Sequence, residues 1–156
     1  MNYTPLDQQD KEILKALQEN AKFTIQELCD RIGLTRTPTF QRVKRLEKEG
    51  LIKRYSAVID KKKAGFGLLV FCNVTLKEHA LPLLQKFRLE VAGIKEVVEC
   101  HHLTGHYDYL LRVVVPDMDA YNTFLLEKLA SIENISNVQS SFVMSTLVEE
   151  SPIPFL

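Results

Sequence analysis

Several features that would assign a protein to a common class are missing from this chain of 156 residues. No run of 18 apolar residues occurs, so the sequence offers no candidate membrane-spanning helix. The N-terminal stretch MNYTPLDQQDKE lacks the charged-then-apolar pattern of a secretion signal, which predicts a cytoplasmic protein with no membrane partner. Apolar residues nevertheless make up 46% of the chain, which is ample for a packed core.

Cysteine is scarce, and its three positions, Cys29, Cys72 and Cys100, are odd in number and far apart. They therefore predict neither a disulfide framework nor a CxxC metal pair. The stretch Cys100-His101-His102 contains metal-ligand types, but neighbouring residues of a strand point to opposite faces and cannot share one ion without distortion. We therefore expect ordinary sheet or interface histidines, with no metal and no cofactor.

Motifs that carry catalysis are also missing. The chain has no nucleophile elbow, no P-loop, no GxGxxG and no paired-carboxylate motif. A nucleophile at Cys100 with His102 as its base would have no third group to orient the histidine. The sequence therefore predicts that the protein is not an enzyme.

The formal net charge of zero hides a strong asymmetry between the two halves. Residues 1–63 hold 14 Lys and Arg against 9 Asp and Glu, whereas residues 64–156 hold 6 against 11. A net charge of +5 followed by one of −5 indicates a division of labour. The basic half is the candidate nucleic-acid binder.

The basic half is predicted to form a helix-turn-helix. Apolar spacing and capping residues predict a helix over residues 6–19, a second from Thr24 to Gly33 and a third from Thr35 to Gly50. The alternation in residues 51–58 predicts a short two-stranded wing. We place this domain at residues 1–60 and a Lys- and Gly-rich linker at residues 61–67.

The third helix of this half is amphipathic and basic. A helical wheel places Phe40, Val43 and Leu46 on an inward face, opposite a polar face that suits the major groove. A solvated charged face is the alternative interpretation of this helix alone. The predicted contact residues are Thr35, Arg36, Thr37, Gln41, Arg42 and Arg45, with Lys44, Lys53 and Arg54 on phosphates.

The acidic half, residues 68–156, is predicted to be a ferredoxin-like β-α-β-β-α-β domain, which makes the chain an α+β protein. In the run LLVFCNVTL the apolar residues run on rather than alternate, which predicts a buried strand. The expected elements are strands at 68–76, 94–103, 106–115 and 135–150, with helices at 79–91 and 117–132.

Three stretches in this order resemble the Lrp/AsnC (feast/famine) family of transcription regulators. They are LDQQDKEILKALQENAK, IGLTRTPTFQRVKRLEKEGLIKRYSAVID and LTGHYDYLLRVVVPDMDAY. The resemblance implies a sequence-specific regulator of double-stranded DNA with a pseudo-palindromic operator. It also implies an ACT-like (RAM) C-terminal domain that forms homodimers and higher even oligomers, up to an octamer. The alternative is an amino-acid sensor that acts on a protein partner and shows no salt-dependent DNA affinity.

The resemblance further implies an amino-acid effector bound between the C-terminal domains of neighbouring dimers. The family's Gly-Asp-aromatic-Asp loop corresponds to Gly105-His106-Tyr107-Asp108, in which a histidine replaces the first acid. Gly105 lets a ligand approach the backbone, and Asp108 could accept hydrogen bonds from an α-ammonium group. The remaining expected effector residues are Met118, Ser140, Ser141, Phe142, Val143 and Met144.

Two residues of this loop have open alternatives. His106 either makes effector binding sensitive to pH or simply points into solvent. Tyr107 and Tyr109 alternate with Asp108 along the predicted strand, so both tyrosines could instead be core or interface residues.

Overall fold

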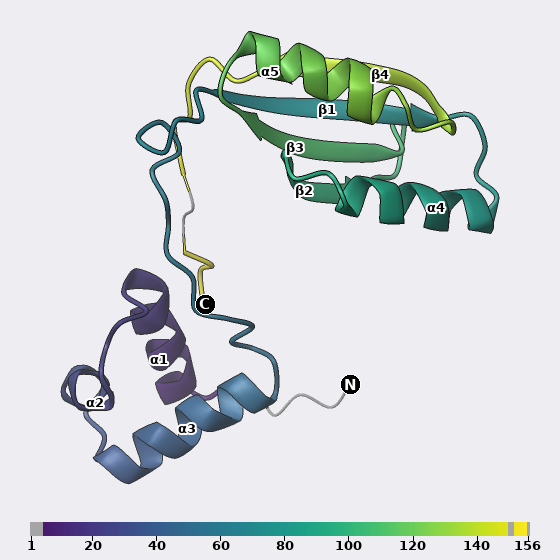
Figure 1. Cartoon of the computed structure of the whole chain (residues 1–156). Helices are drawn as coiled ribbons and strands as arrows, with labels where there is room; N and C mark the ends of the chain where they lie inside the picture. Colours follow the sequence, from purple (N-terminus) through teal and green to yellow (C-terminus); the bar gives the residue numbers. More distant parts are fainter. Residues whose placement is uncertain (1–4, 150–151, 156) are drawn as a thin grey trace. The chain divides into compact units, whose positions relative to one another are not determined.

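The computed structural model describes residues 5–149 and 152–155, which form two compact units (Figure 1). Unit 1 combines the described residues up to Val58 with those from Val148 onward, and unit 2 spans Ile59–Leu147. The first boundary, between Val58 and Ile59, lies close to residue 60, where we placed the end of the first domain. The C-terminal residues, which we had assigned to the second domain, cluster instead with the helices of unit 1.

Unit 1 is built on three helices, α1 (Gln8–Glu19), α2 (Ile25–Ile32) and α3 (Arg36–Lys48). The first two begin at capping boxes. Asp7 Oδ1 accepts the amide of Asp10 at 2.9 Å in α1, and Thr24 Oγ1 accepts the amide of Glu27 at 3.2 Å in α2. Such caps satisfy amides that have no partner within the helix.

The turn between α2 and α3 depends on Gly33, whose φ of 71° lies in the left-handed region that favours glycine. The three helices then pack around one apolar core, in which Ile13, Leu28 and Leu46 are almost completely buried. Local caps and a shared core together fix the helix-turn-helix geometry.

The segment after α3 differs from the prediction. Residues 51–58 form no strand, so the predicted two-stranded ladder is absent from the described chain. The amide of Ile52 bonds the carbonyl of Leu46 at 3.1 Å, and the chain then runs on extended. Alternation indicates extended backbone, but a hairpin also needs a turn, and LIKRYSAV contains no Gly, Pro, Asn or Asp to make one.

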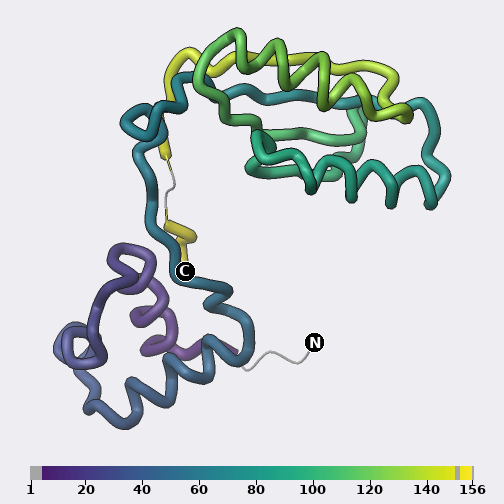
Figure 2. The backbone as a smooth tube through the Cα atoms, in the orientation of Figure 1, coloured from purple at the N-terminus to yellow at the C-terminus, as the bar shows by residue number. Residues whose placement is uncertain are grey.

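Unit 2 is a four-stranded antiparallel sheet of order β2-β3-β1-β4 with helices on one face (Figures 1 and 2). The β-α-β-β-α-β order confirms the predicted ferredoxin-like α+β class. Its elements are β1 (Leu68–Leu76), α4 (Leu81–Ala92), β2 (Val97–His102), β3 (Tyr109–Val115), α5 (Met118–Thr123), the π-helical continuation η1 (Phe124–Leu129) and β4 (Ile135–Phe142).

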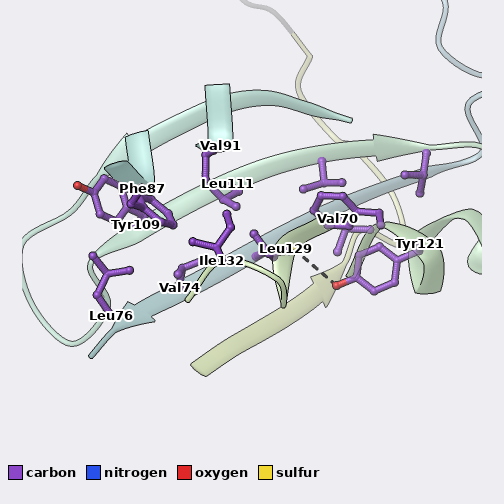
Figure 3. Close-up of a cluster of buried hydrophobic side chains, with 14 residues drawn as sticks. Val70, Val74, Leu76, Phe87, Val91, Tyr109, Leu111, Tyr121, Leu129 and Ile132 are labelled. Atoms are coloured by element: carbon purple, nitrogen blue, oxygen red, sulfur yellow. Dashed lines mark hydrogen bonds between the residues drawn. The ribbon is translucent and has the colours of Figure 1, made fainter. Parts of the chain in front are cut away.

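The core of unit 2 lies between the helices and one face of the sheet (Figure 3). Alternate residues of β1, such as Val70 and Val74, meet Phe87 of α4 and Phe124 at the start of η1, all at most 1% exposed. The predicted buried strand is buried on one face in the single chain. Its opposite residues, Leu69 and Phe71 among them, are only half-buried, because no described element of the chain covers that face.

The last strand is shorter than predicted. β4 ends at Phe142, and residues 143–149 contain no further strand, although the sequence pattern extends to residue 150. Phe142 pairs with Val70, so only Leu69 and Leu68 of β1 remain beyond this point, too few for β4 to pair as far as residue 150. Among the helices that the structure describes, none has the length and apolarity needed to cross a membrane.

Candidate DNA-binding face and effector-binding loop

One side of α3 is exposed, and its side chains are polar or basic with a single aromatic. The opposite side is fixed by burial of Thr39, Val43 and Leu46 against the other helices. Thr39 is held further by two bonds, since its hydroxyl donates to the carbonyl of Thr35 at 3.0 Å and accepts from Cys29 Sγ at 3.3 Å. The exposed residues of the helix are Arg36, Thr37, Phe40, Gln41, Lys44 and Lys48.

The position of Phe40 corrects the helical wheel. We expected Phe40 in the inward stripe, but it is 48% exposed, and the threonine before it is buried. The packing of α3 favours the small Thr39, whose hydroxyl finds buried partners. Sequence hydrophobicity alone could not identify this choice.

Two of the predicted DNA-contact residues are engaged inside unit 1. Arg42 Nη1 lies 2.6 Å from Asp7 Oδ2 and 2.8 Å from Asp10 Oδ1, and Arg45 also pairs with Asp10. The Asp10 side chain is completely buried, so it depends on these guanidinium groups. Arg42 and Arg45 therefore hold α3 against α1, which makes them poorer candidates for base recognition than the exposed residues.

Four basic side chains of α3 and of the segment that follows it form no ion pair with any residue that the structure describes: Arg36, Lys48, Lys53 and Arg54. Lys44 pairs only with Glu47, at 2.8 Å, and 58% of its side chain remains exposed. Thr35 precedes the helix as its N-cap without a side-chain capping bond, so its hydroxyl is not needed for the cap. The arrangement leaves cations on the exposed face that could meet phosphates.

The predicted effector loop connects β2 to β3. Gly105 has a φ of 119°, a conformation that side-chain-bearing residues rarely adopt, and a Cβ there would meet nothing within 4 Å. Tyr107 donates its hydroxyl hydrogen bond to Gln139 Oε1 of β4, which ties the loop to the edge strand on the far side of β1. His106 is exposed and its ring meets that of Tyr107 edge-on at 4.8 Å. The backbone at Gly105 is thus open to a ligand.

The carboxylate of Asp108 already accepts two hydrogen bonds. Oδ2 accepts the amide of Leu76 at 2.7 Å, and Oδ1 lies 2.7 Å from His79 Nε2. Burial alone would raise the pKa of Asp108, but the Leu76 amide and the His79 ring outweigh it and hold the pKa below its ordinary value. Asp108 is therefore ionised and fixes the end of β1 to the loop, whether or not it also touches a ligand.

The other predicted effector residues of β4 extend from the middle of the sheet toward the end opposite the loop. The loop adjoins the end of β1 at Val74–Leu76, whereas Cys72 pairs with Ser140 and Val70 pairs with Phe142. Counted along β1 from Val74 at about 3.3 Å per residue, Ser140 lies about 7 Å from the loop and Phe142 about 13 Å from it. One chain therefore brings Ser140 close to the loop, whose Tyr107 bonds the adjacent Gln139, and leaves Phe142 and the residues after it farther away.

This second group combines anchored and exposed residues. Ser140 bonds the hydroxyl of Tyr121, and Phe142 meets the Tyr121 ring edge-on at 5.0 Å. Met118 is 50% exposed at the start of α5, and Met144 is fully exposed beyond β4. Ser141 is exposed as well, while the amide of Val143 bonds Leu69 at 3.0 Å. The group presents flexible apolar side chains to solvent.

The histidines near Cys100 take ordinary sheet positions. His101 pairs with Glu99 at 3.3 Å, and His102 stacks on Tyr109 with ring centroids 4.8 Å apart. Burial raises the pKa of the Cys100 thiol. Within residues 5–149 and 152–155, no three His, Cys, Asp or Glu side chains are placed to share a metal ion.

Comparison with known proteins identifies the chain. Residues 6–53 match the family model of winged helix-turn-helix DNA-binding domains, and residues 69–153 match that of the Lrp/AsnC ligand-binding domain. The chain belongs to the Lrp/AsnC family. It is 36% identical over 146 residues to the leucine-responsive regulatory protein of Escherichia coli (strain K12), covering 94% of this chain and 89% of that protein.

Solved structures of the Lrp/AsnC family agree with the fold. A transcriptional regulator from Neisseria meningitidis in complex with L-Met superposes with a TM-score of 0.91 at 35% identity, covering 96% of this chain and 97% of that chain. An AsnC family regulator from Agrobacterium tumefaciens superposes with a TM-score of 0.90 at 36% identity and the same coverage. The protein is thus a DNA-binding transcription regulator of Lrp/AsnC type with a ligand-binding domain.

Membership in the Lrp/AsnC family decides between the earlier alternatives. Because the family consists of transcription regulators, the prediction that the chain is not an enzyme is confirmed. A sensor that acts only on a protein partner is not favoured, since the matched N-terminal model is a DNA-binding domain. Sequence reasoning missed Asp10 and His79 and placed Phe40 on the wrong side of α3, because the positions of these residues depend on contacts between elements.

Proposed function

We propose that the protein is a sequence-specific regulator whose DNA affinity responds to an amino acid bound between two copies of the chain. The observation that supports the effector part is the distance of Phe142 and Val143 from the loop. Asp108 bonds Val74, whereas Phe142 pairs with Val70 and Val143 bonds Leu69 near the start of β1, so a small ligand that contacts the loop and these residues needs a second copy. Related proteins named as leucine-responsive or solved with L-Met support an amino-acid effector.

The uncovered face of the sheet supports self-association. Leu69, Phe71 and Leu110 lie on this face and are only half-buried in the single chain. Covering such a face removes apolar surface from water. The proposed assembly is a homodimer that forms higher even oligomers, octamers among them.

Two-fold pairing also constrains the operator. Two copies of α3 related by a dimer axis would enter successive major grooves, with half-sites about 34–36 Å apart or a multiple of that spacing. The polar residues Arg36, Thr37 and Gln41 supply the base contacts, while Lys48, Lys53 and Arg54 meet phosphates. An effector bound between copies changes operator affinity only if it binds one assembly more tightly than another.

The first experiment is a thermal-shift screen of the full chain against the twenty amino acids. A ligand at about 100 times its Kd should stabilise the protein by about 2.7 kcal/mol. A hit should also change operator affinity and the light-scattering mass. If no amino acid shifts the melting temperature, the effector proposal fails, while DNA binding is unaffected.

Mixing two variants tests whether the site lies between copies. His106→Trp obstructs the loop, and Met144→Asp places a charge among the effector residues that follow β4. Both side chains are exposed, so both variants should fold. Each variant alone should lose the thermal shift. Mixed oligomers should recover binding at about a quarter of the sites, because one copy supplies an intact loop and the other an intact strand end. No recovery would mean that each site belongs to a single chain.

A further inference from the structure

Phe40 is an apolar side chain in the middle of a polar face. It is 48% exposed and lies one turn after Thr37 and one turn before Lys44, beside Gln41. Single exposed apolar residues are common on protein surfaces and need no explanation by themselves. Phe40 differs because the face that exposes it is the one that the helix-turn-helix presents to DNA.

The register of α3 is fixed, so Phe40 cannot turn into the core. Thr39 and Val43 occupy the buried side, and the two hydrogen bonds of the Thr39 hydroxyl hold that register. Lys44 Nζ lies 5.8 Å from the centroid of the Phe40 ring, within the range of a cation–π contact. The ring is therefore held outward, next to a cation that suits a phosphate.

The major groove offers one apolar group to such a ring. Each base edge there presents hydrogen-bond donors or acceptors, but only thymine adds the C5-methyl group. A phenyl ring cannot satisfy the polar edges, whereas contact with the methyl removes apolar surface of both partners from water. The chemistry of the face thus favours a T·A pair opposite Phe40.

We propose that Phe40 contacts the C5-methyl of a thymine and selects that base at one position of each half-site. The inference rests on α3 being the helix that enters the major groove, as in the proposed function. It adds a residue that selects a base through an apolar contact, which the polar side chains of α3 cannot make.

The test uses an operator selected from random duplexes by the full-length protein. Each thymine is then replaced in turn by deoxyuridine, which removes only the methyl group. Wild-type protein should lose about fourfold in affinity at one thymine per half-site, the effect of burying one methyl group. Phe40→Ala should lose a similar factor on the natural operator and show no further loss at that deoxyuridine.

Two other variants serve as controls. Phe40→Leu keeps an apolar group and should retain part of the deoxyuridine effect. Gln41→Ala lies beside Phe40 on the same face and should retain all of it while weakening binding through another position. Since Phe40 is half-exposed, all three variants should fold, which thermal unfolding checks.

Three results would overturn the inference. Equal deoxyuridine sensitivity in wild-type protein and Phe40→Ala would assign the methyl contact to another residue. Dissociation of the oligomer by Phe40→Ala with unchanged deoxyuridine sensitivity would make the ring part of a self-association surface. A selection that enriches no sequence would contradict sequence-specific binding itself, and the inference would fail with it.

Discussion

Asp108 shows how one carboxylate can serve the fold before it serves a ligand. Both of its oxygens already accept hydrogen bonds, from the amide of Leu76 and from the ring of His79. A carboxylate has room for further donors, so a ligand contact remains compatible with this geometry. The loss of ligand binding in an Asp108 variant would not by itself identify a direct contact, because the loop would lose its anchor as well.

Replacing Asp108 with Ala should therefore destabilise the protein even without effector. The amide of Leu76 would lose its partner in a buried position, at a cost of about 1–3 kcal/mol near pH 7. Because the folded-state pKa lies below the ordinary value of 3.8, the ionised carboxylate contributes fully above about pH 4. That contribution disappears as the pH falls through the folded-state pKa, so the difference from wild type should narrow there.

Urea unfolding between about pH 2 and 7 measures this difference. Asp108→Asn is the matched control, since its amide oxygen can still accept the Leu76 bond, and it should lose less stability than Asp108→Ala. A gap between wild type and Asp108→Ala that stays constant over the whole range would show that the charge of Asp108 contributes nothing.

At the level of elements, the buried carboxylate of Asp10 connects α1 to α3. It meets both Arg42 and Arg45, so the basic character of α3 is partly used inside the unit. Arg45→Ala should lower the free energy of unfolding by about 1–3 kcal/mol. This loss is smaller than that from breaking a fully buried ion pair, because the Arg45 side chain is 32% exposed. DNA affinity should fall by a similar factor for every operator sequence.

Denaturant unfolding and DNA titrations separate these effects. Lys48→Ala is the comparison on the same helix: its side chain is exposed, so stability should change little while the salt dependence of DNA binding becomes weaker. If Arg45→Ala keeps wild-type stability and loses discrimination at a single base pair, Arg45 reads a base and the ion pair is dispensable.

The elements themselves could largely be predicted, because helix spacing, caps and turn residues act locally. Asp7, Thr24 and Gly33 mark helix ends in the sequence and in the structure. The predictions that were wrong concern features that depend on contacts with other elements. The choice between Thr39 and Phe40 as the buried residue is made by the bonds of Thr39 to Cys29 and Thr35, which no periodicity encodes.

Contacts with other elements also explain why the burial of β1 and the end of β4 could not be predicted. The apolar run of β1 correctly indicates a strand, yet the pattern cannot say whether its second face is covered by this chain or by another. The extended pattern of β4 continues to residue 150, but beyond Phe142 only Leu69 and Leu68 of β1 remain. The length of the partner strand therefore limits how far β4 can extend, and local propensity alone does not reveal that limit.

At the level of the whole molecule, the chain passes between the two units twice, since residues from Val148 onward return to unit 1. The side chain of Gln18 bonds the backbone of Ile153 in both directions, accepting its amide at 2.7 Å and donating to its carbonyl at 3.3 Å. Phe155 packs against the helical core within a groove of about 630 Å³ that α1 and residues 51–58 also line. The tail is thus a structural part of the DNA-binding unit.

Phe155→Ala should consequently destabilise unit 1 and leave unit 2 unchanged. Fully buried phenylalanines cost about 3–5 kcal/mol when truncated, so the partly buried Phe155 should cost about 1–2 kcal/mol. Hydrogen exchange should become faster in α1 and α2 but not in β1 or β3. Ile153→Ala is the control, because its side chain is 68% exposed and its backbone bonds to Gln18 persist. Equal loss of protection in both units would show that the tail stabilises the molecule as one cooperative fold.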